Sequence, residues 1–263
     1  MEIQQIRNAT LKITYGKMTF LVDPWLAERG AMGCLADYKM TIPDAAKEKI
    51  KMPTVGLPQS SEEILAGIDA YIITHIHPDH IDMCPDGTVG MLLNKSLPVY
   101  VQNAEDQAIL LKSGFKFVTV LTEQVLELPN NVNLKKTPAL HGTIKPCGPA
   151  SGFILECTNE KSLYVAGDTI WFPGVGNTLA AYKPEVIVLN ACAAKLEEYG
   201  RILMDDADVA KVYEACPDAS IIASHMDTVA HAFLSRLTLK EKLSNRKIQD
   251  KILIPKDGET MQF

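Results

Sequence analysis

The sequence predicts an α/β (α+β) protein in which two β-sheets are covered by outer helices. Short apolar or alternating segments typical of strands recur along the whole chain, and capped amphipathic segments typical of helices lie between them in both halves. No linker, low-complexity tract or short repeat divides the chain. Such elements pack naturally as two layered sheets, because each sheet must bury an apolar face. We therefore expect a single domain over residues 1–263.

The N-terminal segment has a β pattern. Apolar residues alternate with polar ones at Ile3, Ile6, Leu11, Ile13 and Tyr15. Gly16-Lys17 predicts a hairpin turn, and Met18–Val22 predicts a short buried strand that ends at Asp23-Pro24. Strands in this first half are expected to be mainly antiparallel.

Residues 25–62 interrupt the regular pattern with several glycines and prolines. Their periodicity is weak, and we expect only one short helix, near residues 43–50. A loop of this length is often a lid or a binding loop. A purely structural cover is an equally good interpretation.

Regular elements resume at Ser60, where Ser-Ser-Glu-Glu predicts a capped helix start. The predicted strands that follow are 70–74, 97–101, several short ones up to Pro138, 151–156, 162–166, 186–189, 220–223 and 251–254. The predicted helices are 103–114, near 177–182, 205–215 and 237–243.

Composition excludes several classes of protein. The net charge is −6 and no Lys/Arg run exceeds a dipeptide, so a nucleic-acid binder is not expected, because phosphate neutralisation needs a basic face. The six cysteines form no C-x-x-C pair, which is typical of free thiols in a reducing compartment. Residues 1–11 lack the apolar run of a signal peptide, and no apolar stretch approaches the roughly 18 residues that span a bilayer. We expect a cytoplasmic protein without a membrane partner.

Four metal-ligand side chains occur within six residues directly after the predicted strand 70–74: His75, His77, Asp79 and His80. Residues i and i+2 of an extended segment point to the same side, so His75 and His77 can reach one ion. Pro78 then bends the chain, which can turn Asp79 and His80 towards a second ion. A surface loop that is rich in histidine by chance could have the same sequence, but four potential ligands within six residues favour a metal site.

Three further candidates follow strands or extended runs: His141, Asp168 and His225. Each is weak evidence alone. Together they complete two sets, in which His75, His77 and His141 hold a first ion and Asp79, His80 and His225 hold a second, with Asp168 bridging. Imidazole and carboxylate ligands suit Zn²⁺ best, with Mn²⁺ or Fe²⁺ as alternatives.

The H-x-H-x-D-H run, the later single His, the G-D-T at Asp168 and the late single His resemble the metallo-β-lactamase superfamily, in order and spacing along nearly the whole chain. The segments 21–26 and 166–171 more narrowly resemble the branch that includes L-ascorbate-6-phosphate lactonase. The resemblance implies a four-layer αββα sandwich, a hydroxide bridging two metals, and Asp23 as a carboxylate behind the ligands. The branch points to a homo-oligomer.

Two ions about 3.5–4 Å apart can lower the pKa of a shared water towards 7 and polarise a substrate oxygen. Asp79 is the candidate catalytic residue, since its free oxygen could orient the hydroxide; a purely ligand role is equally compatible. Asp23 and Asp82 are candidate acceptors for ligand His N–H groups. The candidate substrate contacts are Asn190, His231 and the aromatic pair Trp171 and Phe172, although each also has an ordinary structural interpretation.

The leading prediction is therefore a metal-dependent hydrolase of a small, anionic ester, lactone or phosphodiester, attracted by the metals and by lysines such as Lys145. One alternative, a nucleic-acid phosphodiesterase, predicts a basic face. A di-iron oxidoreductase of the same fold would carry a Glu where His77 stands. A non-catalytic, metal-stabilised binding module would lack part of the ligand set.

Overall fold

The first sheet begins with the predicted N-terminal hairpin. In the computed structural model, which describes residues 1–263, β1 (Glu2–Arg7), β2 (Thr10–Tyr15) and β3 (Met18–Val22) are antiparallel. Gly16 and Lys17 both have positive φ, at 55° and 64°. This two-residue turn matches the right-handed twist of the flanking strands, so the predicted turn is confirmed.

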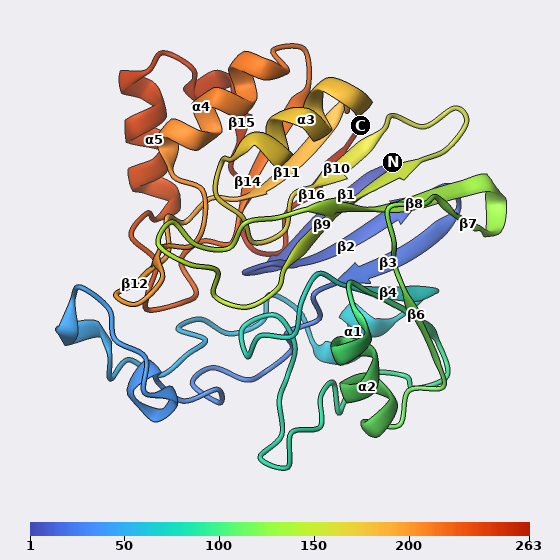
Figure 1. Ribbon diagram of the computed structural model, residues 1–263, viewed down its shortest axis with the longest axis horizontal. Helices are drawn as coiled ribbons and strands as arrows, with labels where there is room; N and C mark the ends of the chain where they lie inside the picture. Colours follow the sequence, from blue (N-terminus) through green and yellow to red (C-terminus); the bar gives the residue numbers. More distant parts are fainter.

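Three more strands extend this sheet beyond β3 in a parallel arrangement: β4 (Ala70–Ile73), β5 (Pro98–Val101) and β6 (Phe117–Val120). The expectation of mainly antiparallel strands was therefore wrong beyond β3, because parallel neighbours are joined by long crossovers rather than tight turns. The short strand β16 (Thr260–Gln262), which the sequence analysis missed, pairs with β1. The two chain ends consequently lie near each other (Figure 1).

The second sheet changes from antiparallel to parallel pairing at β10. Its strands, in spatial order, are β15 (Ile252–Leu253), β14 (Ser220–Ser224), β11 (Val186–Asn190), β10 (Leu163–Val165), β9 (Ser151–Glu156), β8 (Val132–Pro138) and β7 (Leu126–Leu128). The helices α3 (Pro173–Tyr182), α4 (Asp206–Ala215) and α5 (Arg236–Asn245) connect its parallel strands.

Three apolar clusters define four layers. One cluster lies between the sheets and joins residues such as Phe20 and Phe153. A second packs the outer face of the first sheet against α1 (Ser61–Leu65) and α2 (Ala104–Lys112). The third packs the second sheet under α3, α4 and α5. Figure 1 shows these helices above one sheet and α1 and α2 below the other. The αββα sandwich expected from the resemblance is confirmed.

Helix boundaries follow local chemistry. Ser60 and Glu63 form the reciprocal capping contacts predicted at the start of α1. The helix expected near 177–182 begins earlier, at Pro173, because proline suits the first helical turn. The helix expected at 43–50 is only a 3-10 turn, Ala45–Lys47, which buries no side chain. The remaining short elements are the 3-10 turns 35–38, 129–131 and 249–251 and the hairpin β12 (Lys195–Leu196)–β13 (Gly200–Arg201).

The irregular segment 25–60 is tied to the second half of the chain. Leu35, Ile42 and Met52 are buried in the same apolar cluster as the helices of the second sheet. The Thr54 amide donates to the Thr228 carbonyl (2.9 Å), and the Glu197 amide donates to the Thr41 carbonyl (3.0 Å). The segment therefore lies over the β12–β13 side of the molecule.

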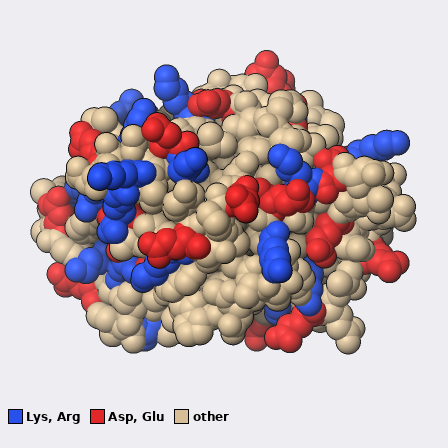
Figure 2. Space-filling view, turned by 90° about the horizontal axis from the view of Figure 1, so that it is seen from above, with Lys and Arg blue, Asp and Glu red and all other residues tan.

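On one face of the molecule, surface charge is mixed in sign. Figure 2 shows Lys and Arg side chains interspersed with Asp and Glu on the face seen from above. Every helix falls short of the length and apolar character that crossing a bilayer requires.

Candidate metal centre

The His-rich loop begins where β4 ends beside β3, and a buried carboxylate fixes its first residue. Asp23, directly after β3, accepts hydrogen bonds from the Thr74 amide and the Thr74 hydroxyl, both at 2.7 Å. Asp23 has a φ of 43° and is 1% exposed. Because two parallel strands end at the same sheet edge, this contact sets the direction in which residues 75–80 leave the sheet.

Three histidines from this loop and from the segment after β8 form a first group, which we call the first-ion triad: His75, His77 and His141. Their ligand nitrogens all lie within 4.8 Å of one another. His75 Nε2 is 2.9 Å from His77 Nδ1. The rings are held from behind, since His141 Nδ1 is 2.9 Å from the Ile202 carbonyl oxygen and His75 Nδ1 is 3.1 Å from the Thr74 hydroxyl.

A second group, the second-ion triad, consists of Asp79, His80 and His225. His225 Nε2 is 3.3 Å from His80 Nε2 and 3.5 Å from Asp79 Oδ2. The opposite nitrogen of His80, Nδ1, is 2.9 Å from Asp23 Oδ2. Asp23 thus holds both the loop backbone and one of its histidines, as expected of a carboxylate behind a ligand.

Asp168 lies between the two triads. Its Oδ2 is 3.2 Å from His80 Nε2, 3.6 Å from His141 Nε2 and 3.8 Å from His75 Nε2. Asn190 Nδ2 donates to its Oδ1 at 2.6 Å. The structure therefore brings all seven predicted ligands together, and it gives Asn190 the role of orienting the central carboxylate.

Burial keeps most of the histidines neutral. Desolvation, with repulsion from neighbouring imidazoles, lowers the pKa of His77 to about 4 and that of His75 well below the usual range. The pKa of His225 is also lowered by burial. Neutral imidazole is the form that binds metal.

His80 differs, because the attraction of Asp168 and Asp23 outweighs its burial and raises its pKa well above the usual value. Burial alone would raise the pKa of Asp168, but the neighbouring His80 and His225 hold it well below the ordinary range. Buried, ionised carboxylates among converging imidazole nitrogens are suitable donors for divalent first-row ions.

Sequence reasoning missed Asn8, which is completely buried in the turn between β1 and β2. Its Nδ2 donates to the Asp79 carbonyl at 3.0 Å and is 3.1 Å from His225 Nε2. Its Oδ1 has no partner, which fits a site completed by another group. An Asn with a positive φ (52°) is ordinary in a turn, so no sequence signal distinguished it.

Cys192 was likewise missed. Its Sγ is 3.6 Å from His225 Nδ1, behind the second-ion triad. The proposed role of Asp82 was wrong: its Oδ2 accepts from the Leu26 amide at 3.0 Å and no histidine contacts it.

A small cavity of about 50 Å³, which we call the metal chamber, opens above the two triads. The irregular segment covers it with Met32, Leu35, Tyr38 and Met40. The remaining walls are His77, Pro78, Asp79, His141, Cys147, Asp168, Leu196, Ile202 and His231.

His231 is the one predicted substrate contact that lines the chamber. Its Nδ1 has no partner, and burial lowers its pKa to about 4. Lys145 instead forms an exposed ion pair with Glu198, and neither it nor Trp171 or Phe172 lines the chamber. Trp171 and Phe172 pack against the apolar cluster of the second sheet.

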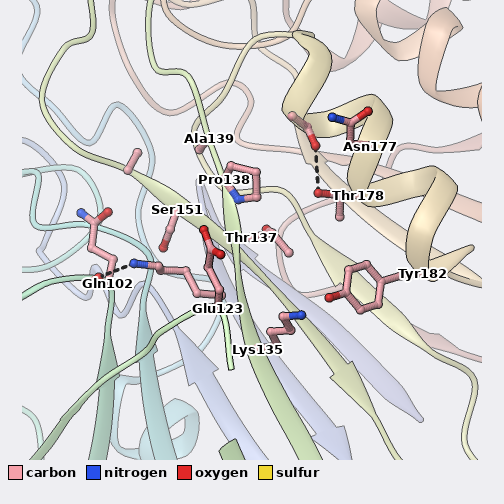
Figure 3. A pocket seen from close by; sticks show the side chains of 13 residues that line it. Gln102, Glu123, Lys135, Thr137, Pro138, Ala139, Ser151, Asn177, Thr178 and Tyr182 are labelled. Atoms are coloured by element: carbon pink, nitrogen blue, oxygen red, sulfur yellow. Dashed lines mark hydrogen bonds between the residues drawn. The ribbon is translucent and has the colours of Figure 1, made fainter. Parts of the chain in front are cut away.

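The largest cavity lies elsewhere. It has a volume of about 500 Å³ and is formed by β8, the start of β9 and α3, with Lys135, Thr137, Asn177 and Tyr182 among its walls (Figure 3). None of the seven candidate ligands lines it. Size alone therefore does not identify the reactive site.

Comparisons with known proteins agree with this geometry. The family model described as "Beta-lactamase superfamily domain" matches residues 19–226. "UPF0173 protein YddR" of Bacillus subtilis (strain 168) is 36% identical over the full length of both chains.

Two solved structures are also similar. An isothiocyanate hydrolase from Delia radicum gut bacteria is 35% identical, with a TM-score of 0.89 over 100% of this chain and 99% of the other. A protein of Veillonella parvula DSM 2008, titled a possible metal-dependent hydrolase, is 32% identical, with a TM-score of 0.90 over the same shares. The narrower resemblance to the lactonase branch stays a prediction.

Proposed function

Because this chain belongs to the β-lactamase superfamily and is a metal-dependent hydrolase of the metallo-β-lactamase fold, we propose that its substrate is a small, uncharged organic electrophile of the isothiocyanate class. The observation that carries the proposal is the lining of the metal chamber. Its non-ligand walls are mainly apolar, and no Lys or Arg contributes to it.

This lining changes the substrate expected from the sequence. An anionic phosphoester or lactone phosphate is bound best where cationic or N–H donors surround its charge, and apart from the metal ions themselves the chamber offers it no Lys or Arg. Lys145, the lysine considered for that purpose, is paired with Glu198 at the surface. A neutral electrophile needs only an apolar enclosure and a few placed polar groups. The similarity to an isothiocyanate hydrolase at 35% identity supports the same substrate class.

Two divalent ions fit the donor set. The first-ion triad would hold one ion, the second-ion triad the other, and Asp168 would contact both. When bound, such ions lower the pKa of a coordinated water towards about 7 and polarise the substrate. Zn²⁺ suits these imidazole and carboxylate donors best.

The remaining roles belong to side chains that face the chamber. Asp79 offers a carboxylate that can accept a proton from the attacking water. His231 is neutral at pH 7, because burial holds its pKa near 4. It therefore acts as a hydrogen-bonding group towards the substrate and not as an imidazolium acid. Leu196, Ile202 and the methionines exclude bulk water.

The reaction is balanced without a further reactant. The oxygen of water adds to the central carbon of R–N=C=S, and its protons pass to nitrogen and sulfur, which gives a thiocarbamic acid. The C–N bond then breaks, and the S–H proton passes to the nitrogen. The products are the amine R–NH₂ and carbonyl sulfide.

The test is turnover by the purified protein after metal analysis. We expect amine release from methyl isothiocyanate that disappears with a chelator and returns with Zn²⁺. His77→Ala protein serves as the control for spontaneous hydrolysis. Faster hydrolysis of an anionic phosphodiester or lactone phosphate than of any isothiocyanate would contradict the proposal.

The same experiment separates the alternatives. A nucleic-acid phosphodiesterase would cleave a bis-nitrophenyl phosphate or RNA, and the face shown in Figure 2, on which Lys and Arg are interspersed with Asp and Glu, gives that activity no support. A non-catalytic binding module would bind the metal and turn over none of these compounds.

A further inference from the structure

A second cavity lies beside the metal chamber and is the most apolar of the larger cavities. It has a volume of about 280 Å³, and ten of its 13 lining residues are hydrophobic. We call it the apolar hollow and define it by Trp25, Leu26, Met83, Met91 and Leu92. The first two come from the segment after β3, and the other three from the segment between β4 and β5.

The apolar hollow and the metal chamber share three walls: Met32, Tyr38 and Pro78 line both cavities. Pro78 stands between the candidate ligands His77 and Asp79 in the chain. Tyr38 is fixed to the same segment, because its hydroxyl donates to the Met32 carbonyl at 3.0 Å. A single layer of side chains therefore separates the hollow from the ligands.

The volumes of the two cavities indicate which part of a substrate each of them can hold. The metal chamber, at about 50 Å³, has room for only a few water-sized groups, since a cavity needs about 10–15 Å³ to hold one water. A reacting group fits there, but an alkyl or aryl chain does not. The hollow, at about 280 Å³, is large enough for such a chain.

Three apolar side chains of the hollow are also largely exposed to solvent in the isolated chain. Met91 is 73% exposed, Leu92 50% and Met83 44%. Clustered exposed apolar groups beside a cleft mark a binding surface. Methionine side chains adapt to ligands of different shape.

Charge restricts the ligand further. The charged residues that line the hollow are Glu28 and Asp82, and no Lys or Arg lines it. Asp82 Oδ1 is buried without a partner. An anionic group would meet these carboxylates with no Lys or Arg among the lining residues, so charge disfavours an anion, and the ten hydrophobic lining residues favour an uncharged group.

We propose that the apolar hollow binds the uncharged alkyl or aryl tail of the substrate while the reacting carbon lies in the metal chamber. This inference rests on the function proposed above. It makes the hollow the determinant of substrate selectivity, with the Met32 and Tyr38 side chains at the passage between the two cavities.

A paired substitution tests it. Met91→Asp places a charge at the rim, at a side chain that is exposed and outside the apolar core. Leu237→Asp, at a 67% exposed leucine on α5 outside the hollow, is the matched control. We expect kcat/KM for 2-phenylethyl isothiocyanate to fall about tenfold in Met91→Asp, the scale on which an apolar pocket discriminates. The kcat/KM for methyl isothiocyanate should stay unchanged, as should both values in the control. An equal fall for both substrates, or no fall, would overturn the proposal.

A binding measurement keeps this test separate from the proposed reaction. 2-Phenylethanol carries the same tail and no electrophile, and Trp25 of the Trp171→Phe protein reports its binding by fluorescence. Binding that Met91→Asp weakens supports the hollow even if no isothiocyanate is hydrolysed. Absence of binding to the wild-type hollow would overturn the inference, and so would a wild-type dimer that Met91→Asp dissociates, because a second copy would then occupy the surface.

Discussion

The two triads differ in charge and in burial. The first-ion triad is three histidines, held from behind by neutral partners such as the Ile202 carbonyl, and His77 is partly exposed in the metal chamber. The second-ion triad contains the Asp79 carboxylate, is more deeply buried although Asp79 also lines the chamber, and has the Asp23 carboxylate behind His80. The fold thus places more negative charge around the second position and leaves the first with its most exposed ligand, His77, in the substrate space. We infer that the second ion is retained more tightly and that the first exchanges more readily.

The largest effect should come from the residue shared by both triads. Asp168→Ala removes the carboxylate that lies within 4 Å of ligand nitrogens on both sides. We expect both ions to be lost and turnover to fall by more than the roughly 100-fold that outer contacts produce. Metal analysis by mass spectrometry measures the loss. Asp106→Ala, which removes another buried carboxylate, on α2 and outside both triads, is the control, and full metal content in Asp168→Ala would contradict the bridging role.

His77→Ala should separate the triads. It removes one ligand of the first ion and none of the second, so the metal content should fall from about two ions to about one. Turnover should fall about 100-fold or more, since a ligand matters at least as much as its outer partners. Retention of the ion in the second-ion triad is checked by Co²⁺ absorption spectra. Loss of both ions would show that the two positions are not independent.

The candidate ligands could be predicted from the sequence more completely than the residues that hold them in place. The run from His75 to His80, with Asp168, could be recognised because metal-binding side chains are rare and here were concentrated at strand ends. Asn8 and Cys192 could not, since a turn asparagine and a buried thiol look like ordinary structural residues until folding brings them to His225. The parallel pairing of β3 with β4 was missed because pairing depends on long-range contacts, whereas the Gly16-Lys17 turn is decided locally. The apolar chamber was also invisible, because residues 25–60 have no periodic pattern.

A smaller and more selective effect should follow from Asp23→Asn. The asparagine keeps the size of the side chain but removes the charge behind His80, and it cannot accept equally from His80 Nδ1 and from both Thr74 groups. We expect the affinity for the second ion to fall about 10–100-fold, with the first ion unaffected. Competition with a chromophoric chelator measures the two affinities. A uniform loss at both positions would mean that Asp23 acts through the stability of the fold, and thermal unfolding of the metal-free protein would reveal it.

The smallest effect is a difference in pH dependence between the triads. In the metal-free protein, burial alone would lower the pKa of His80, but the attraction of Asp168 and Asp23 raises it well above 6.5. His80 therefore carries a proton at pH 7 where the second ion would bind. That proton stabilises the metal-free fold fully below about pH 6.5, and its contribution is lost as the pH rises through the folded-state pKa. Binding of the second ion must expel it, so the affinity should rise by up to about tenfold per pH unit until the pH reaches the folded-state pKa of His80. His75 and His77 of the first-ion triad need release no such proton, because burial lowers the pKa of His77 to about 4 and holds that of His75 well below its usual value, so neither adds a pH dependence to this affinity near pH 7. Calorimetry in two buffers of different ionisation enthalpy counts the protons released, and equal proton release at both positions would remove the distinction between the triads.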